Sequence, residues 1–425
     1  MKKYKKRIVD ELLLHKLEGF GAVLIEGPKW CGKTTTARQQ AGSVLDLGNS
    51  KTLEDSLLMI SIDTQRLLDG SVPKLIDEWQ TIPRLWDAVR NEVDNRAEPG
   101  QFILTGSSVP PDVDAIHHSG TGRFARLKMR PMSLFESEES DGSVRLSDLF
   151  NGKGIPSPLD ASDQLKPIAF QCCRGGWPYA TFLKENAALD QAYEYFNSVC
   201  ESDVSRIDKT KRSPERTRQI MRSYARNQGM QIPFSTICSD IKANDKLSIS
   251  DDTVADYVEA LRKLFVIEDM PAWNPNLRSK TAIRTSDTRY FVDPSIAAAA
   301  LGIGPDDLMN DLKAFGMFFE SMAVRDLRIY ASKLGGNVYH YRDSNGLECD
   351  TVIHLRNGKY GLVEIKLGGT EKIEEGAKNI QKLASIIDTT KMQAPSFLMV
   401  LTAVSKYAYR RQDGVFVVPI SSLRD

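Results

Sequence analysis

The sequence has no excess charge of either sign, because 56 Lys and Arg residues balance 56 Asp and Glu residues. Overall charge therefore indicates no particular partner, and any nucleic-acid surface has to be a local patch. Long apolar runs are also missing. Residues 397–404 (FLMVLTAV) are among the longest, and they are far too short to span a bilayer. We therefore expect a protein without a membrane partner.

Cysteines are few and show no pairing pattern. The six cysteines form no CxxC pair and have no spacing typical of metal ligands. The first residues also show no apolar stretch of the kind found in a secretory signal. We therefore expect reduced thiols and a cytoplasmic location.

The length of 425 residues predicts about two to four domains. Apolar strand-like runs alternate with amphipathic helices over residues 1–135, which is typical of an α/β domain. Residues 136–164 are polar and rich in Gly, Ser and Asp, and we expect a linker there. Residues 165–216 are predicted to be a helical connecting region. Three helical patterns and a hairpin over residues 217–302 predict a winged helix. Residues 303–425 predict a second α/β domain.

Residues 27–34, GPKWCGKT, fit the phosphate-binding pattern G-x-x-x-x-G-K-[ST]. The glycines let backbone N–H groups curl around phosphates, and the helix that follows points its positive end at them. We expect Lys33 to reach the β- and γ-phosphates and the Thr34 hydroxyl to bind Mg²⁺. The residues predicted to bind ATP or GTP are Gly27, Pro28, Lys29, Trp30, Cys31, Gly32, Lys33, Thr34, Thr35 and Thr105.

Residues 75–80, LIDEWQ, supply an apolar strand that ends in two acids. Asp77 is predicted to hold Mg²⁺ through water, and Glu78 to polarise the attacking water. The next strand ends in ILTGSS, where Thr105 and Ser107 could sense the γ-phosphate or simply cap a loop. Because these motifs follow one another in the expected order, they support each other.

Residues 120–131, GTGRFARLKMRP, place three arginines in a Gly-rich turn and a strand. One of Arg123, Arg126 and Arg130 could stabilise the transition state at the nucleotide of a neighbouring subunit. The alternative, which stays open, is that all three are solvated strand arginines.

These motifs resemble a family of bacterial and archaeal AAA+-like ATPases that pair an N-terminal P-loop domain with a poorly characterised C-terminal domain. Further stretches carry the resemblance along the chain: GRFARLKMRPMSLFE, GGWP, SDVSRI, YFVDPSIAAAALG and GMFFESMAVRDL. The resemblance implies an ATPase that uses ATP and Mg²⁺ and forms a homo-oligomer. It also assigns the ATPase chemistry to Lys33, Thr34, Asp77 and Glu78, and prefers Arg123 as a finger supplied in trans.

Residues 348–369, ECDTVIHLRNGKYGLVEIKLGG, predict a hairpin with charged side chains in apolar strands. A two-residue Asn-Gly turn would split the apolar side chains between both faces. A three-residue loop with Gly358 in the left-handed region instead places them on one face. In that register Asp350 lies opposite Glu364, with Lys366 diagonal to it. Facing carboxylates repel unless a cation lies near, so Lys366 and a divalent metal are expected there.

The constellation resembles that of the PD-(D/E)XK nucleases, with Glu320 on the apolar helix as the upstream acid. This resemblance implies that Asp350 and Glu364 bind Mg²⁺ and that Glu320 tunes the site. It implies that Lys366 steadies the attacking water or the developing charge on phosphorus. The usual upstream Pro-Asp is replaced by GLECD. This departure leaves catalysis more in doubt than the fold.

Residues 205–226 carry eight Lys and Arg against two acids and could contact DNA phosphates. The predicted recognition helix, residues 250–264, is not strongly basic, so packing or assembly is the open alternative. Two functions therefore remain. One is an ATP-controlled enzyme that cleaves DNA with Mg²⁺. The other is a nucleotide-switched assembly or signalling protein whose C-terminal domain is an inactive binding module.

Overall fold

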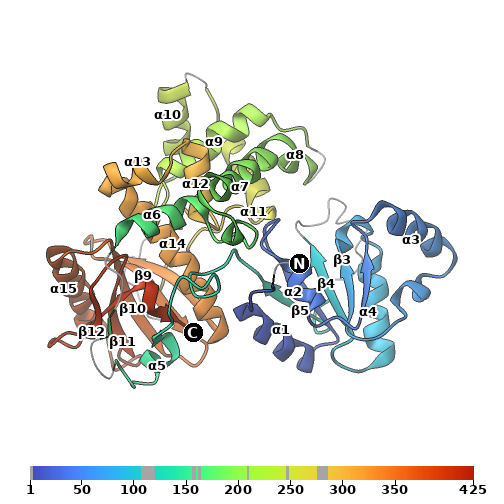
Figure 1. The fold of residues 1–425 in the computed structure, drawn as a ribbon, viewed down its shortest axis with the longest axis horizontal. Helices are drawn as coiled ribbons and strands as arrows, with labels where there is room; N and C mark the ends of the chain where they lie inside the picture. Colours follow the sequence, from blue (N-terminus) through green and yellow to red (C-terminus); the bar gives the residue numbers. More distant parts are fainter. Residues whose placement is uncertain are drawn as a thin grey trace. The chain divides into compact units, whose positions relative to one another are not determined.

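The structure is a computed structural model. It describes residues 3–106, 120–155, 159–160, 164–207, 210–245, 248–274 and 286–425, with the backbone alone at 159–160 and 245. The chain divides into two compact units (Figure 1). The first unit comprises Met1–Pro131, Ser198–Thr217 and Tyr257–Val266; the second comprises Met132–Asn197, Arg218–Asp256 and Ile267–Asp425.

The first unit is built on a parallel sheet. Its strands are β1 (Ala22–Glu26), β2 (Ser43–Asp46), β3 (Lys74–Asp77), β4 (Phe102–Gly106) and β5 (Phe124–Lys128). They lie in the order β2-β3-β4-β1-β5, and each neighbouring pair is parallel. The α/β fold predicted for the N-terminal region is therefore confirmed.

Helices cover both faces of this sheet. They are α1 (Ile8–Gly19), α2 (Lys33–Arg38), α3 (Ser50–Ile62) and α4 (Leu85–Arg96), with 3₁₀ turns at Thr64–Leu68 and Trp79–Thr81. In β1, Leu24 belongs to a core cluster with Val89 of α4, whereas Val23 belongs to another with Leu13 of α1. Alternate residues of a strand point to opposite faces, so a strand covered on both sides is apolar throughout.

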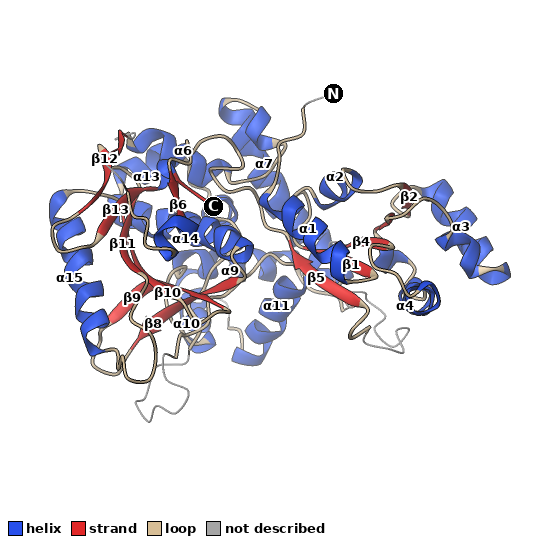
Figure 2. Cartoon of the chain, turned by 90° about the horizontal axis from the view of Figure 1, so that it is seen from below, coloured by secondary structure: helices blue, strands red, loops and turns tan. Residues whose placement is uncertain are grey.

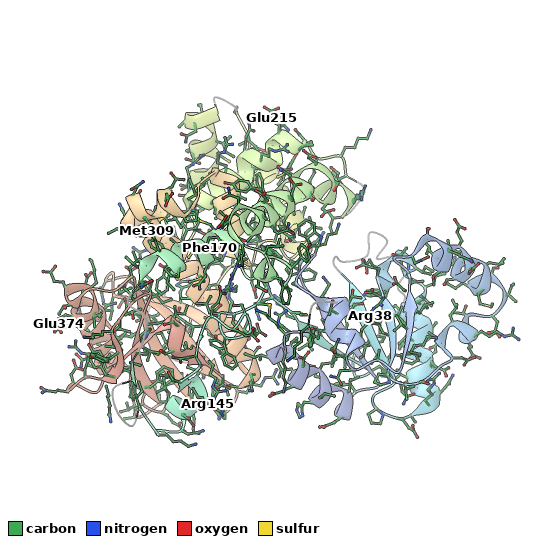
Figure 3. The ribbon with its side chains drawn as sticks, viewed as in Figure 1. Arg38, Arg145, Phe170, Glu215, Met309 and Glu374 are labelled. Carbon is green, nitrogen blue, oxygen red and sulfur yellow. The ribbon has the colours of Figure 1, made fainter. Side chains whose placement is uncertain are left out.

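This arrangement gathers the carboxyl ends of β1, β3 and β4 at one edge, because parallel strands end on the same side. Near that edge, Arg38 in the last turn of α2 (labelled in Figure 3) donates to Asp46 at the end of β2 over 2.8 Å. The first unit also contains a one-turn π-helix (Val199–Asp203), followed by α8 (Val204–Arg206).

The second unit contains a mixed sheet of seven strands in the order β7-β12-β13-β11-β10-β9-β8. The strands are β7 (Leu159–Asp160), β8 (Gly336–Arg342), β9 (Glu348–Leu355), β10 (Tyr360–Lys366), β11 (Phe397–Thr402), β12 (Tyr407–Arg410) and β13 (Phe416–Pro419). β8, β9 and β10 are antiparallel, whereas β10, β11 and β13 are parallel. A separate parallel pair joins β6 (Val144–Arg145) to β14 (Leu423–Arg424).

Two long helices pack on this sheet. α14 (Leu312–Lys333) contacts β8, β9 and β10, and α15 (Thr370–Ile386) contacts β9, β10 and β11. Figure 2 shows the two helices on opposite sides of the strands. The apolar side of α15, which includes Ala377 and Ile380, forms a core cluster with Val352 and Leu362. β9 and β10 are therefore held between two helical layers.

The remaining helices are α5 (Leu146–Phe150), α6 (Leu165–Arg174), α7 (Glu185–Ser198), α9 (Pro214–Arg226), α10 (Phe234–Asp245), α11 (Asp251–Lys263), α12 (Pro294–Leu301) and α13 (Pro305–Asn310). Further 3₁₀ turns lie at Ala180–Phe182 and Ile420–Ser422. Within the described ranges, no helix is both long and apolar enough to cross a membrane.

Residues 136–164, expected to be a linker, contain β6, α5 and β7, and buried Leu146 and Leu149 give this polar segment a packed side. In residues 217–302, α9, α10 and α11 are followed by the antiparallel bridges Ile267 to Phe291 and Met270 to Thr288. Residues 275–285, which come between the bridged stretches in the sequence, lie outside the described residues.

Candidate nucleotide-binding and metal-binding sites

The P-loop follows β1 and needs its glycines. Gly27 has a φ of 155°, and a Cβ atom there would lie 2.0 Å from the Met129 carbonyl oxygen. Gly32 has a φ of 101° and immediately precedes α2. Glycine tolerates both conditions because it has no side chain. The loop therefore turns tightly and presents its backbone to the start of α2.

Lys33 lies inside this loop. Its ammonium donates to the carbonyl oxygens of Gly27 and Pro28, both over 2.8 Å, and the side chain is buried. Carbonyls satisfy the hydrogen bonds of an ammonium but supply no full negative charge. A phosphate placed in the loop would supply that charge, so the residues present fit a nucleotide.

Asp77 brings three elements together at the edge of the sheet. Its Oδ1 atom accepts hydrogen bonds from the Thr34 hydroxyl over 2.8 Å and from the Thr105 hydroxyl over 2.5 Å. These residues belong to β3, α2 and β4 respectively. Thr105 is fully buried, so its hydroxyl orients Asp77. A carboxylate beside a threonine hydroxyl matches the oxygen ligands that Mg²⁺ prefers. Ser107, also suggested by the sequence, lies outside the described residues.

Glu78 follows Asp77 in an unusual backbone conformation. Its φ is 55°, in the left-handed region that side chains rarely adopt. Its Oε2 atom accepts a hydrogen bond from Gln80 Nε2 over 2.5 Å. This backbone conformation points the two neighbouring acidic side chains in different directions. Asp77 therefore faces Thr34, whereas Glu78 lies just beyond the end of β3.

Asp203 contacts the P-loop, although no residue spacing in the sequence indicates this contact. Its Oδ1 atom lies 2.6 Å from the Lys29 ammonium, and both residues belong to the first unit. The Asp203 side chain is only 6% exposed, whereas that of Lys29 is 41% exposed. In the sequence, the stretch SDVSRI indicates only a family resemblance. Its contact with the P-loop depends on the fold.

The exposed Arg123 lies away from the P-loop of its own chain. It precedes β5 and pairs with Asp94 of α4 over 2.8 Å. Its carbonyl accepts the N–H of Ala22 at the start of β1, whereas the P-loop follows the end of that strand. Arg126 pairs with Glu26 over 2.5 Å. The structure therefore does not bring Arg123 to Lys33 within one chain.

The second site lies on the hairpin of β9 and β10, whose predicted register is confirmed. Tyr360 pairs with His354 and Val363 with Thr351, so partners sum to 714 as expected for the three-residue loop. Gly358 has a φ of 84°, and its N–H donates to the Leu355 carbonyl. The next positions in this register are Asp350 and Glu364.

Lys366 joins these two carboxylates. Its ammonium lies 2.7 Å from Glu364 Oε2 and 3.2 Å from Asp350 Oδ2. Asp350 Oδ2 also accepts the backbone N–H of Ile365 over 2.8 Å. Burial and the nearby Asp350 charge raise the pKa of Glu364 to about 8. Burial alone would lower the pKa of Lys366, but Asp350 and Glu364 together outweigh it and raise that pKa.

Helix α15 covers this group of charges with two residues that sequence reasoning missed. Asn379 donates to Glu364 Oε1 over 2.7 Å and to the Glu348 carbonyl over 2.6 Å. A Cβ atom at Gly376 would lie 3.3 Å from Glu364 Cβ, so the helix backbone approaches closely. An E-x-K pattern carries no information about the helix that packs on it.

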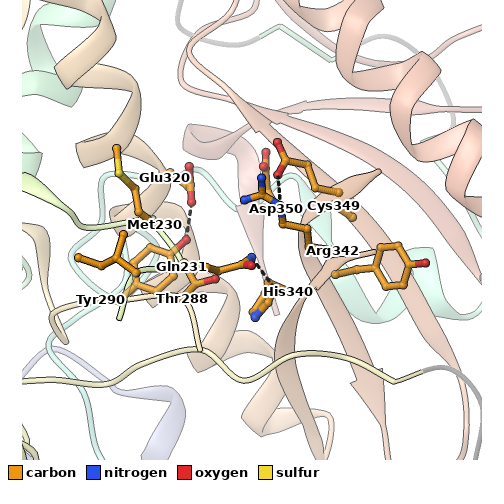
Figure 4. A pocket seen from close by; sticks show the side chains of 13 residues that line it. Met230, Gln231, Thr288, Tyr290, Glu320, His340, Arg342, Cys349 and Asp350 are labelled. Atoms are coloured by element: carbon orange, nitrogen blue, oxygen red, sulfur yellow. Dashed lines mark hydrogen bonds and ion pairs between the residues drawn. The ribbon is translucent and has the colours of Figure 1, made fainter. Parts of the chain in front are cut away.

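Glu320 approaches the same site from α14. Tyr290 donates its hydroxyl to Glu320, and a cavity beside both residues is also lined by Asp350 (Figure 4). Burial and the Asp350 charge raise the pKa of Glu320 to about 8. The four residues predicted for this site are therefore electrostatically linked.

Asp350 and Glu364 could supply only a few ligands to a metal ion. Among the described residues, no group of three or more His, Cys, Asp and Glu side chains could hold a metal ion. Mg²⁺ is often held through one or two carboxylates and keeps several waters. Asp350 and Glu364 fit that mode of binding, with Lys366 balancing their charge.

Family models match three successive parts of the chain. Residues 20–138 match an AAA domain, which contains the P-loop and Asp77. Residues 166–307 match a domain of unknown function (DUF8612), and residues 315–423 match another (DUF4143). The N-terminal region therefore resembles AAA-type P-loop ATPases, a family that hydrolyses ATP and usually uses Mg²⁺.

Two curated relatives are similar over most of the chain. They are the uncharacterized proteins Mb2031c of Mycobacterium bovis and Rv2008c of Mycobacterium tuberculosis. Each is 24% identical over 366 residues, which cover 84% of this chain and 73% of the relative.

Solved structures show more distant similarity. The Walker-type ATPase PABY2304 of Pyrococcus abyssi has a TM-score of 0.43 at 15% identity, covering 68% of this chain and 94% of that one. The ORC2 protein of Aeropyrum pernix has a TM-score of 0.31 at 13% identity, covering 72% and 93% respectively. These scores are too low to show a common fold over the compared length.

Proposed function

We propose that this protein binds and hydrolyses ATP at the edge formed by β1, β3 and β4. The convergence of Thr34 and Thr105 on Asp77 carries this proposal, and the Lys33 ammonium held inside the P-loop supports it. Lys33 leaves the loop carbonyls and binds the β- and γ-phosphates. Thr34 and Asp77 would hold Mg²⁺, which would offset charge on the phosphates when bound.

Glu78 orients the attacking water and accepts its proton. Its position directly after Asp77 supports this role, since it leaves β3 beside the ligands of the metal. Arg123 acts on the nucleotide of a second copy of the chain, because it lies at the other end of β1 from its own P-loop. We therefore propose a homo-oligomer.

A second candidate function is Mg²⁺-dependent cleavage of a phosphodiester in DNA by a nuclease-like domain at residues 303–425. The approach of Lys366 to both Asp350 and Glu364 favours it. Asp350 and Glu364 would hold the metal, Glu320 would tune their charge, and Lys366 would stabilise the attacking water. The alternative is an inactive binding module in a nucleotide-switched assembly.

The central region is proposed to be a winged helix, based on the order of α9, α10, α11 and the following antiparallel bridges. It would contact DNA phosphates through basic residues of 205–226 or serve in assembly. The proposed domain order is an ATPase domain at residues 1–135, a linker at 136–164, a helical connection at 165–216, a winged helix at 217–302 and the nuclease-like domain.

One crossed experiment tests both activities. Release of phosphate from ATP and cleavage of plasmid and linear DNA with Mg²⁺ or Mn²⁺ are measured for wild type, Lys33→Ala, Glu78→Gln and Asp350→Asn. Lys33→Ala and Glu78→Gln should each lower ATP turnover by at least roughly a hundredfold, since the first removes a cation from the transferred phosphoryl group and the second removes the base that accepts the proton of the attacking water. Asp350→Asn should abolish cleavage and leave ATP turnover unchanged.

The outcomes separate the proposals. Unchanged ATP hydrolysis in Lys33→Ala would refute the ATPase assignment. Cleavage that survives Asp350→Asn would show a contaminating nuclease or another site. Absence of cleavage in wild type together with a trapped oligomer in Glu78→Gln would favour the switch.

A further inference from the structure

A cavity of about 390 Å³ opens beside Asp350 and Glu320 in the second unit. Its walls include the segment from Gly229 to Ile232, together with Thr288, His340 and Arg342 (Figure 4). Pockets of this size accommodate a small organic ligand. The site proposed for phosphodiester cleavage does not use most of these residues.

His340 sets the hydrogen-bonding pattern of this cavity. Its Nε2 atom lies 3.0 Å from the Ser286 carbonyl oxygen, which only accepts hydrogen bonds. Nε2 therefore carries the proton, and in the neutral ring Nδ1 is an acceptor. Gln231 Nε2 lies 2.9 Å from that Nδ1 and donates to it. The orientation of the Gln231 amide is thereby fixed, with Oε1 as an acceptor that no described residue uses.

Two uncharged side chains of the cavity each have a polar atom without a hydrogen-bond partner in the described part of the chain. Gln231 Oε1 and the Thr288 hydroxyl are both buried without a hydrogen-bond partner among the described residues. Thr288 is only 3% exposed. Leaving a buried polar atom without a partner destabilises the folded state, so two such atoms in one cavity point to a ligand that satisfies them. A ligand with an N–H or O–H group facing Gln231 and a polar atom facing Thr288 would satisfy both.

Charge identifies one end of the ligand. The charged residues that line the cavity are Glu320, Glu348, Asp350 and the cationic Arg342. Asp350 is one of the proposed metal ligands, and a phosphate beside it would rely on that metal as well as on Arg342. Arg342 Nε has no hydrogen bond to any described residue, and its ion pair with Glu348 Oε2 is long at 3.7 Å. An arginine in that state is available to a phosphate oxygen. The ligand therefore combines a phosphate at the Asp350 end with a polar, hydrogen-bonding body.

We propose that this cavity holds one unpaired nucleoside of a DNA strand whose neighbouring phosphate lies at Asp350 and Glu364. The inference rests on the proposed phosphodiester cleavage and adds the form of the substrate. Every DNA base has at least one N–H group for Gln231 Oε1, so the cavity accepts all bases. A base pair stacked in a duplex does not fit a cavity of this size, so single-stranded or unstacked positions are preferred.

The test measures equilibrium binding of a fluorescent single-stranded oligothymidylate and of a blunt duplex to the full chain. Ca²⁺ replaces Mg²⁺ to keep the strand intact, and a gel verifies that it is. The variants are Thr288→Val and Gln231→Leu, and Ser422→Ala is the matched control. Ser422 also carries a buried hydroxyl without a partner in the described part of the chain, but it does not line the cavity.

Wild type should bind the single strand more tightly than the duplex. Thr288→Val and Gln231→Leu should each weaken single-strand binding by roughly three- to tenfold, as expected for one neutral hydrogen bond, and Ser422→Ala should not. The melting temperature of Thr288→Val should equal or exceed that of wild type, because the lost hydroxyl has no protein partner. Equal affinities of wild type and both cavity variants, or no binding of the single strand by wild type, would overturn the inference.

A second measurement tests whether the cavity binds the base at one particular position of the strand. An abasic residue is scanned along the oligothymidylate, and a double-mutant cycle is formed with Thr288→Val. At one position the abasic strand should bind wild type and variant equally. If Thr288→Val weakens binding by the same factor wherever the abasic residue lies in the strand, the inference is contradicted. Weakened binding in the variants supports the cavity even if wild type does not cut DNA, in which case only the proposed cleavage fails.

Discussion

At the scale of single residues, His340 makes the second unit sensitive to acid. Burial lowers its pKa below the usual value of about 6.5. The Ser286 carbonyl and Asp287 act in the opposite direction, and Arg342 adds to the lowering. The folded state therefore binds this proton more weakly than the unfolded chain does. The associated stability is present above about pH 6.5 and is lost as the pH falls through the lowered pKa.

Thermal unfolding followed from about pH 8 to about pH 5 should show this loss. The decrease in melting temperature should be smaller in His340→Gln, which cannot take up a proton. His15→Gln is the control, because the His15 side chain is 82% exposed. His354, whose pKa burial also lowers, contributes equally to all three proteins. Identical pH profiles for wild type and His340→Gln would contradict the prediction.

At the scale of elements, the one-turn π-helix at Val199–Asp203 ties a distant stretch of sequence to the P-loop. Asp203 is buried and pairs with Lys29, so removing the cation leaves a buried carboxylate without its partner. Lys29→Met should therefore lower the free energy of unfolding by about 1–3 kcal/mol, and by more than Asp203→Asn does. The partial exposure of Lys29 keeps this below the cost at a fully buried pair.

Urea denaturation of both single variants and the double variant measures this coupling. Lys29→Met combined with Asp203→Asn should recover part of the stability lost in Lys29→Met alone. If the losses in free energy of unfolding of the two single variants simply add in the double variant, the pair contributes nothing to stability. The π-helix would then be held by other contacts.

The same elements show what sequence could and could not predict. The hairpin register followed from apolar parity around Gly358, because a slip by one residue would move Ile365 to the other face. The P-loop followed from its spacing. The π-helix at Val199–Asp203 has no comparable residue pattern, so the sequence does not predict the contact of Asp203 with Lys29. Asn379 was missed for a similar reason, since only the packing of α15 brings it to Glu364.

At the scale of the whole molecule, the two candidate sites lie in different compact units. A ligand that binds only the folded state stabilises it by mass action, by about 2.7 kcal/mol at a hundredfold excess over Kd. A slowly hydrolysed ATP analogue with Mg²⁺ should therefore raise the melting temperature of wild type and of Asp350→Asn. Lys33→Ala should show little increase.

Amide hydrogen exchange locates the effect. Protection on adding the analogue should increase in β1, β3 and α2, which surround the P-loop. Loss of the nucleotide-dependent increase in Asp350→Asn would mean that the metal-site residue also governs ATP binding, contrary to this prediction.

The left-handed backbone at Glu78 has one more consequence. Glycine would adopt that conformation with a free energy lower by about 1 kcal/mol, so Glu78→Gly should give a more stable protein that lacks the base proposed to activate water. Selection for a more stable fold and selection for ATP hydrolysis would therefore favour different residues at this position. A lineage in which the ATPase became dispensable would be expected to drift towards glycine there, leaving a mark of lost activity in its sequence.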